Sequence, residues 1–258
     1  MCKFMMIQEN IRAVKEWAGK IRTAAQKSGG KGVFNGIWCL DCFLCLESTE
    51  GAALCQNCER LLAKSGFACP VCAVPLPAGG RCGECLRDPP PFDDVLTAFD
   101  YRFPLDRLVQ RFKFSADLAV GAYLGDALAK AVATATKPDL IVASPASRAR
   151  LIERGFNPAL VLATRVASGL HLKVEPRALA KVRHTPAQTG LDRAFRRRNL
   201  RGAFAVCRPV QGLHVAVVDD VMTTGATLGA LAAALKKAGA SRVSGWVVAR
   251  TPEPPRKG

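Results

Sequence analysis

The stretch VAVVDDVMTTGATL (215–228) joins an apolar run, an acidic pair and a loop of small residues. The run VAVV is typical of a buried strand, and Asp219 and Asp220 follow at its carboxyl end. Open α/β sheets place their ligands at that end of the strands. The loop Thr223–Thr227 leads directly into an alanine-rich helix, so its amides, its hydroxyls and the helix N-terminus can bind a phosphate group.

The acidic pair and the loop together predict a sugar-phosphate site. The carboxylates of Asp219 and Asp220 can accept hydrogen bonds from ribose hydroxyls. Gly225 lets the backbone approach a phosphate more closely than a side chain would allow. A buried strand followed by a capped helix would account for an acidic pair alone, but it does not account for the whole pattern.

The elements around this stretch indicate the fold class. Apolar strands are expected at 139–143, 214–218 and 242–248, and helices at 117–135, 158–168 and 227–238. Strands that alternate with helices form right-handed βαβ units, so the sequence predicts an α/β protein with a parallel sheet flanked by helices.

Eleven cysteines are present, and nine of them lie between Cys39 and Cys85. They form an internal duplication of C-x2-C-x9-C-x2-C, because each paired cysteine of the first copy recurs 27 positions later. C-x2-C pairs are typical of structural zinc sites, which use four ligands and leave no open position for chemistry. The expected ligands of two structural zinc ions are Cys42, Cys45, Cys55, Cys58, Cys69, Cys72, Cys82 and Cys85.

The pairing of these cysteines is open on spacing alone. One zinc per repeat is favoured, and a cross-braced pairing of the first C-x2-C with the third is the alternative. Iron–sulfur ligation or a metal-free redox pair would use the same residues. Cys39 makes the register of CLDCFLC ambiguous, and the 27-residue offset selects Cys42 and Cys45.

Charge and composition place the chain among globular proteins with anionic partners. The formal net charge is +16, and 49% of the residues are hydrophobic. No stretch approaches the length of a transmembrane helix, and charges interrupt the first residues too early for a secretory signal. A cytoplasmic location is therefore expected, where clustered thiols usually hold metal.

Changes in composition divide the chain into five segments. A basic N-terminal extension (1–38) has helical spacing and is either an arm for anionic surfaces or a frayed extension. The other expected segments are the double zinc ribbon (39–87), a proline-rich linker (88–94), the α/β domain (95–251) and a flexible tail (252–258).

The stretch 215–228 resembles the phosphoribosyl pyrophosphate (PRPP) motif of type I phosphoribosyltransferases. Together with the zinc ribbons, YRFPLDRLVQRFKFSAD, IERGFN, HTPAQTGLDRAFRRRNLRGAF and VVART, it resembles the ComF family of competence proteins over roughly residues 40–251. The resemblance implies a phosphoribosyltransferase-like sheet. The PRPP-binding residues that it implies are Asp219 and Asp220 at the ribose 2′- and 3′-hydroxyls and, around the 5′-phosphate, Val221, Met222, Thr223, Thr224, Gly225, Ala226 and Thr227.

The same resemblance implies a pyrophosphate loop. The charge that leaves with pyrophosphate requires cations nearby, for which a solvated basic face is the alternative interpretation. The loop is the segment Ser144, Pro145, Ala146, Ser147 and Arg148, and the cations are Arg148, Lys181 and Arg183, with Lys113 as a weaker fourth. The segment 181–201 resembles the mobile loop that covers the site. This chain departs from the family in reading Pro-Ala-Ser for Pro-Leu-His after the strand, Pro158 after RGFN and Phe195 for Glu. No general base stands out, and His184 is the best-placed titratable residue.

The resemblance implies three functions for the α/β domain. One is PRPP-dependent transfer to an unidentified acceptor, with Mg²⁺ accompanying PRPP. Another is competence, which would involve single-stranded DNA and a helicase partner, and the basic segment 181–201 is compatible with DNA. The third is a PRPP-binding sensor without turnover.

Overall fold

The computed structural model describes residues 41–49, 51–62, 66–183 and 199–252, together with the backbone of a two-stranded hairpin. The strands of that hairpin are β1 (Val33–Phe34) and β2 (Ile37–Trp38), which pair antiparallel. The helical pattern expected within 1–38, the segment 184–198 and the last six residues lie outside the described residues.

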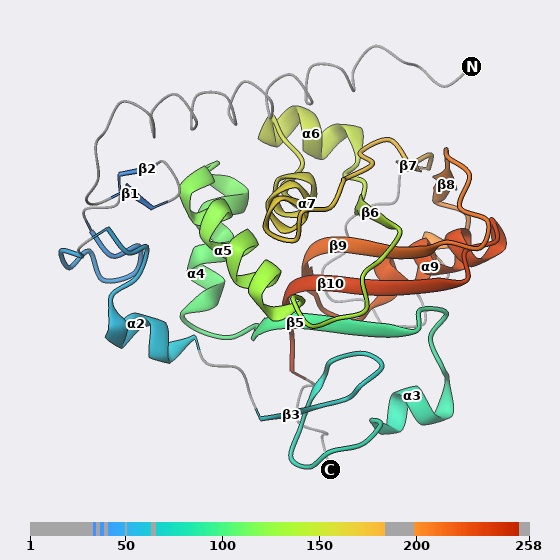
Figure 1. Ribbon diagram of the computed structural model, residues 1–258, viewed down its shortest axis with the longest axis horizontal. Coiled ribbons are helices and arrows are strands. Elements are labelled where there is room, and N and C mark those ends of the chain that lie inside the picture. The colour runs from blue at the N-terminus through green and yellow to red at the C-terminus, as the bar shows by residue number, and fades with distance from the viewer. Residues whose placement is uncertain are drawn as a thin grey trace.

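A parallel sheet forms the centre of the protein, as the sequence predicts, but it has four strands where the sequence indicates three (Figure 1). Its strand order is β5 (Asp94–Asp100), β10 (Arg242–Arg250), β9 (His214–Met222) and β6 (Leu140–Ala143). The two central strands are apolar on both faces, as strands covered by helices on both sides must be. Strand β5 begins at the last residue of the expected linker.

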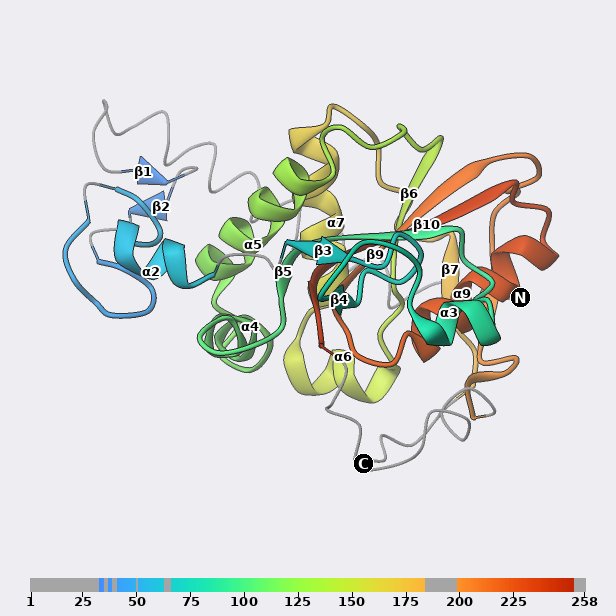
Figure 2. The same ribbon diagram turned by 90° about the horizontal axis from the view of Figure 1, so that it is seen from below.

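Helices cover both faces of this sheet (Figure 2). One face packs against α4 (Leu105–Phe114), α5 (Leu118–Ala131) and α7 (Pro158–Gly169), and the other packs against α9 (Ala226–Lys237). The side chains of β9 alternate accordingly. Ala216 and Val218 belong to the core beneath α5 and α7, and Val215 and Val217 belong to the core beneath α9.

Helix α5 is shorter than the sequence predicts. Asp117 is its N-cap, because the Asp117 carboxylate accepts a hydrogen bond from the backbone N–H of Val120 at 3.2 Å. The helix ends at Ala131, four residues before the expected end. The stretch VATATKP (132–138) follows, and its β-branched residues and its proline favour an end of the helix over its continuation.

The two cysteine repeats pack against opposite sides of the domain. The first repeat carries α2 (Gln56–Leu61), and its Cys42 and Cys58 join the core beneath α4 and α5. The second carries the hairpin of β3 (Phe67–Ala68) and β4 (Pro75–Leu76) and the short helix α3 (Gly83–Arg87), and its four cysteines join the core beneath α9. Each repeat therefore supports a different face of the sheet.

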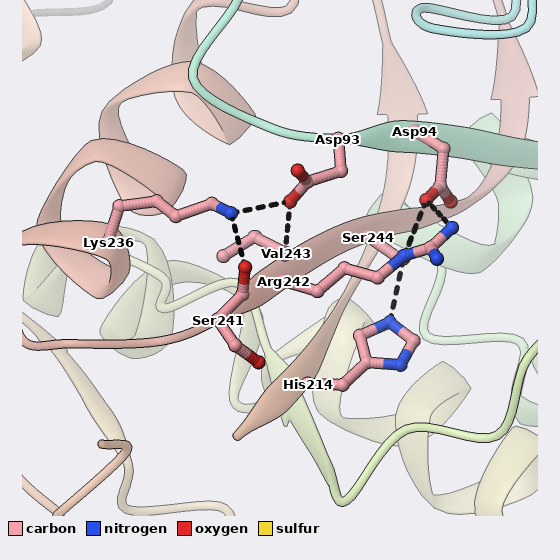
Figure 3. A network of polar contacts seen from close by, with 8 residues as sticks. All are labelled: Asp93, Asp94, His214, Lys236, Ser241, Arg242, Val243 and Ser244. Atoms are coloured by element: carbon pink, nitrogen blue, oxygen red, sulfur yellow. Dashed lines mark hydrogen bonds and ion pairs between the residues drawn. The ribbon is translucent and has the colours of Figure 1, made fainter. Parts of the chain in front are cut away.

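A polar network ties together the amino ends of the central strands (Figure 3). Arg242 Nη2 lies 2.7 Å from Asp94 Oδ2, and Ser244 Oγ donates to the same oxygen at 3.0 Å. Lys236 Nζ lies 2.8 Å from Asp93 Oδ2. These contacts join β5, β10 and α9 at the end of the sheet opposite the expected ligand site.

A two-stranded antiparallel hairpin, β7 (Leu179–Lys181) with β8 (Phe204–Val206), stands beside α9. Helix α6 (Arg148–Arg154) follows β6 and precedes α7. Within the described ranges, no helix is both long enough and apolar enough to cross a lipid bilayer.

Candidate functional site

The acidic pair lies where strand β9 runs past its neighbour β6. The pairing of β6 with β9 ends at Ala143 opposite Val218, whereas β10 continues beside β9 as far as Met222. The sequence predicts that the strand ends at Val218, and the structure extends it by four residues. The extension follows from the continued pairing with β10. Asp219 and Asp220 therefore lie at the carboxyl end of the sheet, where β9 has no partner strand on the side of β6 among the described residues.

The side chains of the acidic pair are held by the local backbone. Asp219 Oδ1 accepts a hydrogen bond from the backbone N–H of Asp220 at 2.9 Å. Asp220 Oδ1 accepts one from the backbone N–H of Val221 at 2.5 Å. Each carboxylate is thereby fixed in orientation while its residue remains partly exposed, as a binding residue requires.

Lys113 reaches this pair from the last turn of α4. Its Nζ lies 2.8 Å from Asp220 Oδ1, and the two side chains are only 18% and 17% exposed. The sequence ranked Lys113 below three other cations, but the structure pairs it with the acidic pair. Only the fold brings this lysine to Asp220, because the two residues lie in distant segments of the chain.

The electrostatics of the pair are unequal. Burial and repulsion by Asp220 raise the pKa of Asp219 to about 7, against the lowering effects of the Asp220 backbone N–H, Lys113 and Ser144. At neutral pH, Asp219 is therefore close to its midpoint of ionisation. A strongly raised carboxyl pKa at the open end of a sheet is typical of a functional site.

The loop Thr223–Thr227 turns at the N-terminus of α9. Gly225 is the N-cap and has a φ of 76°, in the left-handed region that favours glycine. A Cβ at this position would lie 2.6 Å from Met222 Cε, so the end of the Met222 side chain would have to move, and the positive φ would strain any other residue. Thr224 Oγ1 accepts a hydrogen bond from the backbone N–H of Ala226 at 3.4 Å. Residues 223–225 of the expected phosphate loop thus form a tight turn that leads directly into α9.

The expected pyrophosphate loop begins beside the acidic pair. The backbone N–H of Ser144 donates to the carbonyl oxygen of Val218 at 2.9 Å, and the Ser144 side chain interacts with Asp219. Asn157 Nδ2 donates to the carbonyl oxygen of Ser144 at 3.1 Å, which holds the loop against the start of α7. Ser147 caps α6 by accepting from the N–H of Arg150 at 3.4 Å.

The three catalytic candidates are placed differently. Arg148 is exposed at the first turn of α6. Lys181 is half-buried on β7, where burial lowers its pKa first and repulsion by Arg150 second, and its Nζ lies 6.0 Å from the ring centroid of Phe204. Arg183 is exposed and donates to two backbone carbonyls across the hairpin. His184 lies outside the described residues.

Arg154 is a cation that the sequence analysis did not single out. It ends α6, its guanidinium carbon lies 4.9 Å from the ring centroid of Phe114, and it interacts electrostatically with Asp220. The motif IERGFN could have indicated this residue, because the side chain of an arginine at the end of a helix, just before the glycine that ends it, can point back along the helix. Lys113 and Arg154 bring positive charge to the acidic pair from two different helices.

A cavity of about 630 Å³ lies on the other side of the phosphate loop. It runs along α9 between the proline-rich linker and the β7–β8 hairpin, and Thr224, Gly225 and Ala226 form part of its wall. Asp219 and Asp220 do not line it. The acidic pair therefore belongs to the open face at the strand ends and not to this cavity.

The eight repeat cysteines form two groups of four. Within each group, the ligand atoms all lie within 4.8 Å of one another, and the groups follow the sequential pairing that the sequence analysis favoured. Sulfur atoms lie 3.7 Å apart in Cys45–Cys55 and 3.6 Å apart in Cys72–Cys82. Four thiolates around Zn²⁺ at about 2.3 Å lie about 3.8 Å apart, so both groups fit a tetrahedral metal ion.

Backbone N–H groups lower the pKa of the first cysteine of each group. Burial raises the pKa of Cys69, but backbone N–H groups of Cys82 and Cys72 outweigh this effect and lower the pKa to about 7. In the same way, the N–H groups of Cys45 and Cys55 outweigh burial and lower the pKa of Cys42 to about 6. The thiolate is the form that binds a metal.

Fold and site together define a parallel-sheet α/β protein with an acidic pair at its strand ends and two four-cysteine groups. No protein-family model matches the chain. It is 35% identical over 205 residues to DNA utilization protein YhgH of Escherichia coli O157:H7, covering 77% of this chain and 90% of that protein. It is 32% identical over 207 residues to Competence protein F of Haemophilus influenzae, covering 76% and 90%. The chain therefore belongs to the family of these DNA utilization and competence proteins.

Among solved structures, the chain is similar to a purine phosphoribosyltransferase from Pyrococcus horikoshii. The identity is 22%, the match covers 51% of this chain and 81% of that one, and the TM-score is 0.32.

Proposed function

We propose that this protein binds PRPP at the carboxyl end of β9. The observation that carries the proposal is the acidic pair beside a left-handed glycine turn, at the point where β6 stops and β9 continues. Asp219 and Asp220 accept hydrogen bonds from the ribose hydroxyls. The backbone amides and hydroxyls of Thr223–Thr227, at the N-terminus of α9, bind the 5′-phosphate.

The diphosphate of PRPP lies toward the loop of Ser144–Arg148, which leaves the sheet next to Asp219. Mg²⁺ arrives with PRPP, and the oxygen ligands that it prefers are available in the diphosphate and the nearby carboxylates. When bound, the ion neutralises charge on the leaving group. Arg148, Lys181 and Arg183 supply further positive charge for the leaving group.

Transfer would exchange one bond at C1 of the ribose for another. The bond from C1 to the pyrophosphate oxygen breaks, pyrophosphate leaves with the electron pair, and C1 bonds to a nucleophilic atom of the acceptor, which releases a proton. The chain contributes position and electrostatic stabilisation to this reaction. PRPP binding without transfer, in a sensor, is the alternative use of the same site.

Zinc is the metal that we assign to the two cysteine groups. Each offers four sulfur ligands in a closed set, so the ions support the fold and carry out no reaction. The binding of one ion to such a group contributes roughly 10–16 kcal/mol of apparent free energy at neutral pH. Reduced thiols in both groups fit a location in the cytoplasm.

Single-stranded DNA is a second candidate ligand, favoured by an exposed aromatic ring among cations. Phe114 is 67% exposed and is covered on one side by Arg154, and Arg148 and Arg150 are exposed on the same helix as Arg154. Nucleic-acid bases stack on such rings while cations contact the phosphates. The names of the relatives, which refer to DNA utilization and competence, support this use.

Release of pyrophosphate tests the first proposal. Wild-type protein with Zn²⁺ bound is incubated with PRPP and Mg²⁺ and with nucleobase, amine and single-stranded DNA acceptors in turn. Release that Asp219→Ala with Asp220→Ala abolishes supports transfer. PRPP binding without release with any acceptor supports the sensor, and the absence of PRPP binding overturns the proposal.

The salt dependence of DNA binding tests the second candidate. Contacts with phosphates release counterions, so the affinity for single-stranded DNA must fall steeply between about 50 and 200 mM salt. Binding that does not respond to salt, or that is unchanged in Phe114→Ala, would contradict the role of this surface.

A further inference from the structure

Two short motifs interlock next to the acidic pair. RFKF (111–114) ends α4, and RGFN (154–157) ends α6 and begins α7. The rings of Phe112 and Phe156 pack with their centroids 5.6 Å apart, and Phe112 is fully buried. The two motifs therefore place their remaining side chains on a common support.

Three of the four residues of RGFN have structural roles. Gly155 ends α6 with a φ of 76°. Phe156 packs against Phe112. Asn157 caps α7 by accepting from the N–H of Ala159 at 3.1 Å, and it also holds the carbonyl of Ser144. These contacts fix the backbone on both sides of the expected pyrophosphate loop.

Arg154 is the fourth residue of RGFN, and its guanidinium has no comparable structural role among the described residues. Its guanidinium stacks on Phe114, and its Nε is buried without a hydrogen-bond partner among the described residues. A buried donor left unpaired costs about 1–3 kcal/mol. Burial and repulsion by Arg150 lower its pKa, whereas Asp220 acts in the opposite direction. Such a cation is placed to receive an anion.

We propose that Arg154 is a substrate-binding residue whose guanidinium binds the diphosphate of PRPP. The inference rests on the proposed PRPP site. The 5′-phosphate is assigned to the N-terminus of α9, so the anion near α6 and Ser144 is the diphosphate. A planar guanidinium can bind two phosphate oxygens at once, and the Phe114 ring holds it in one plane.

The roles of the two neighbouring cations are then distinct. Lys113 neutralises Asp220 and keeps the ribose-binding acids close together. Arg154 binds the leaving group, and the Ser144–Arg148 loop receives the same diphosphate through its backbone. Arg154 thus extends the pyrophosphate site from the loop to the end of the helix that follows it.

Calorimetric titration with three ligands tests the assignment. The ligands are PRPP, ribose 5-phosphate and inorganic pyrophosphate, and the proteins are wild type, Arg154→Met and Arg154→Lys. Arg154→Met is expected to weaken PRPP and pyrophosphate about ten- to a hundredfold, the usual effect of losing a charged hydrogen bond. Ribose 5-phosphate should change less than about threefold, and Arg154→Lys should fall between the other two proteins.

Arg107→Met is the matched control. Arg107 is exposed on α4, so this variant removes one positive charge from the neighbouring helix without touching the site. It should bind all three ligands as the wild type does. Unfolding midpoints of the variants should agree within a few degrees, which separates loss of binding from loss of fold.

The outcomes distinguish this inference from the proposed function. If the wild type binds PRPP and Arg154→Met binds it equally well, Arg154 is not a diphosphate ligand, and the PRPP site stands. An equal loss of ribose 5-phosphate in Arg154→Met also overturns the assignment. If the wild type binds neither PRPP nor ribose 5-phosphate, the proposed function fails. In that case the titration with pyrophosphate decides the role of Arg154. If the wild type binds pyrophosphate and Arg154→Met does not, the role is supported. If the wild type does not bind pyrophosphate, the role is overturned.

Discussion

Lys113 Nζ lies 2.8 Å from Asp220 Oδ1 and joins the end of α4 to the carboxyl end of the central strand β9. Asp220 is adjacent to Asp219. The charge of Asp220 contributes to the raised pKa of Asp219, and the charge of Lys113 acts in the opposite direction. The lysine thus reduces the repulsion between the two carboxylates, which both face the ribose ring in the proposed function. The position of Lys113 makes α4 part of the candidate site, although the sequence analysis ranked three cations outside α4 above Lys113.

Replacing Lys113 by Met should weaken PRPP binding about tenfold at pH 7. The loss of the positive charge raises the pKa of Asp219 further, so a smaller fraction of the carboxylate is available to accept a hydrogen bond. Part of the loss should be recovered at about pH 8.5, where Asp219 ionises even without the lysine. Titration calorimetry at the two pH values measures both effects.

Lys130→Met is the control for this variant, because Lys130 is an exposed lysine on α5. It should bind PRPP as the wild type does at both pH values. Tighter binding by Lys113→Met would show instead that Lys113 blocks the acidic pair until a ligand displaces it.

Asp219→Asn should stabilise the fold while abolishing ribose recognition. The folded pKa of about 7 lies above the unfolded value of about 3.9, so the unfolded state ionises first. The free energy of unfolding of the wild type therefore falls as the pH rises from about 4 to 7 and then levels off. The side-chain amide of the variant does not ionise, so the variant lacks this dependence and should be more stable than the wild type at pH 8, by at most about 4 kcal/mol for a shift of about three pKa units.

Denaturant unfolding at pH 5 and pH 8 measures that difference. The advantage of Asp219→Asn should be larger at pH 8 than at pH 5. A wild type that gains stability relative to the variant as the pH rises would show that Asp219 ionises easily in the folded protein.

His214 should make the fold sensitive to acid. Burial lowers its pKa first and repulsion by Arg242 second, and its Nε2 lies 2.9 Å from Ser244 Oγ. Below the usual histidine pKa of about 6.5, the unfolded state binds a proton that the folded state resists, so stability is lost as the pH falls. The loss is at most about 1.4 kcal/mol per pH unit.

The comparison with His214→Gln isolates this effect from other acid-sensitive groups, including the cysteines. The difference in unfolding free energy between wild type and variant should shrink from pH 7 to pH 5. A constant difference over that range would assign the acid sensitivity to other residues.

The central strands of the sheet and the turn at Gly225 could be predicted because their signals are continuous in the sequence. VAVV, the acidic pair and the turn at Gly225 lie within a few residues of one another. The strand and the turn therefore follow from the local sequence. The extension of β9 to Met222 could not be read in this way. It depends on β10, which is paired beside β9 as far as Arg250.

The sequence could not identify all the cations near the acidic pair, because their positions depend on tertiary packing. Lys113 and Arg154 lie in different motifs, and the packing of Phe112 on Phe156 joins these motifs next to the same acid. Charge density in the sequence pointed to 181–201 instead, most of which lies outside the described residues. The pairing of the cysteines was likewise open until the fold grouped them.

The two cysteine groups should affect ligand binding differently, because they contact different parts of the domain. Arg250 Nε donates to the carbonyl of Cys72 at 3.0 Å, and its Nη1 donates to the carbonyls of Met222, at 3.2 Å, and Thr223. The second group is thereby tied to the start of the phosphate loop. The first group is tied to α4, where Arg111 Nη1 donates to the carbonyl of Phe43 at 2.6 Å.

Cys55→Ser and Cys82→Ser change equivalent positions of the two repeats and form a matched pair. Each should lower the zinc content, measured by native mass spectrometry, from two ions to one. Cys82→Ser should weaken ribose 5-phosphate about tenfold, because Arg250 loses its anchor, whereas Cys55→Ser should leave that affinity within about twofold. Arg250→Lys should keep both ions and still weaken ribose 5-phosphate, since a lysine cannot reach several carbonyls with a planar fork. Equal affinities in Cys55→Ser and Cys82→Ser, together with an unaffected Arg250→Lys, would show that the phosphate loop keeps its shape without the second cysteine group.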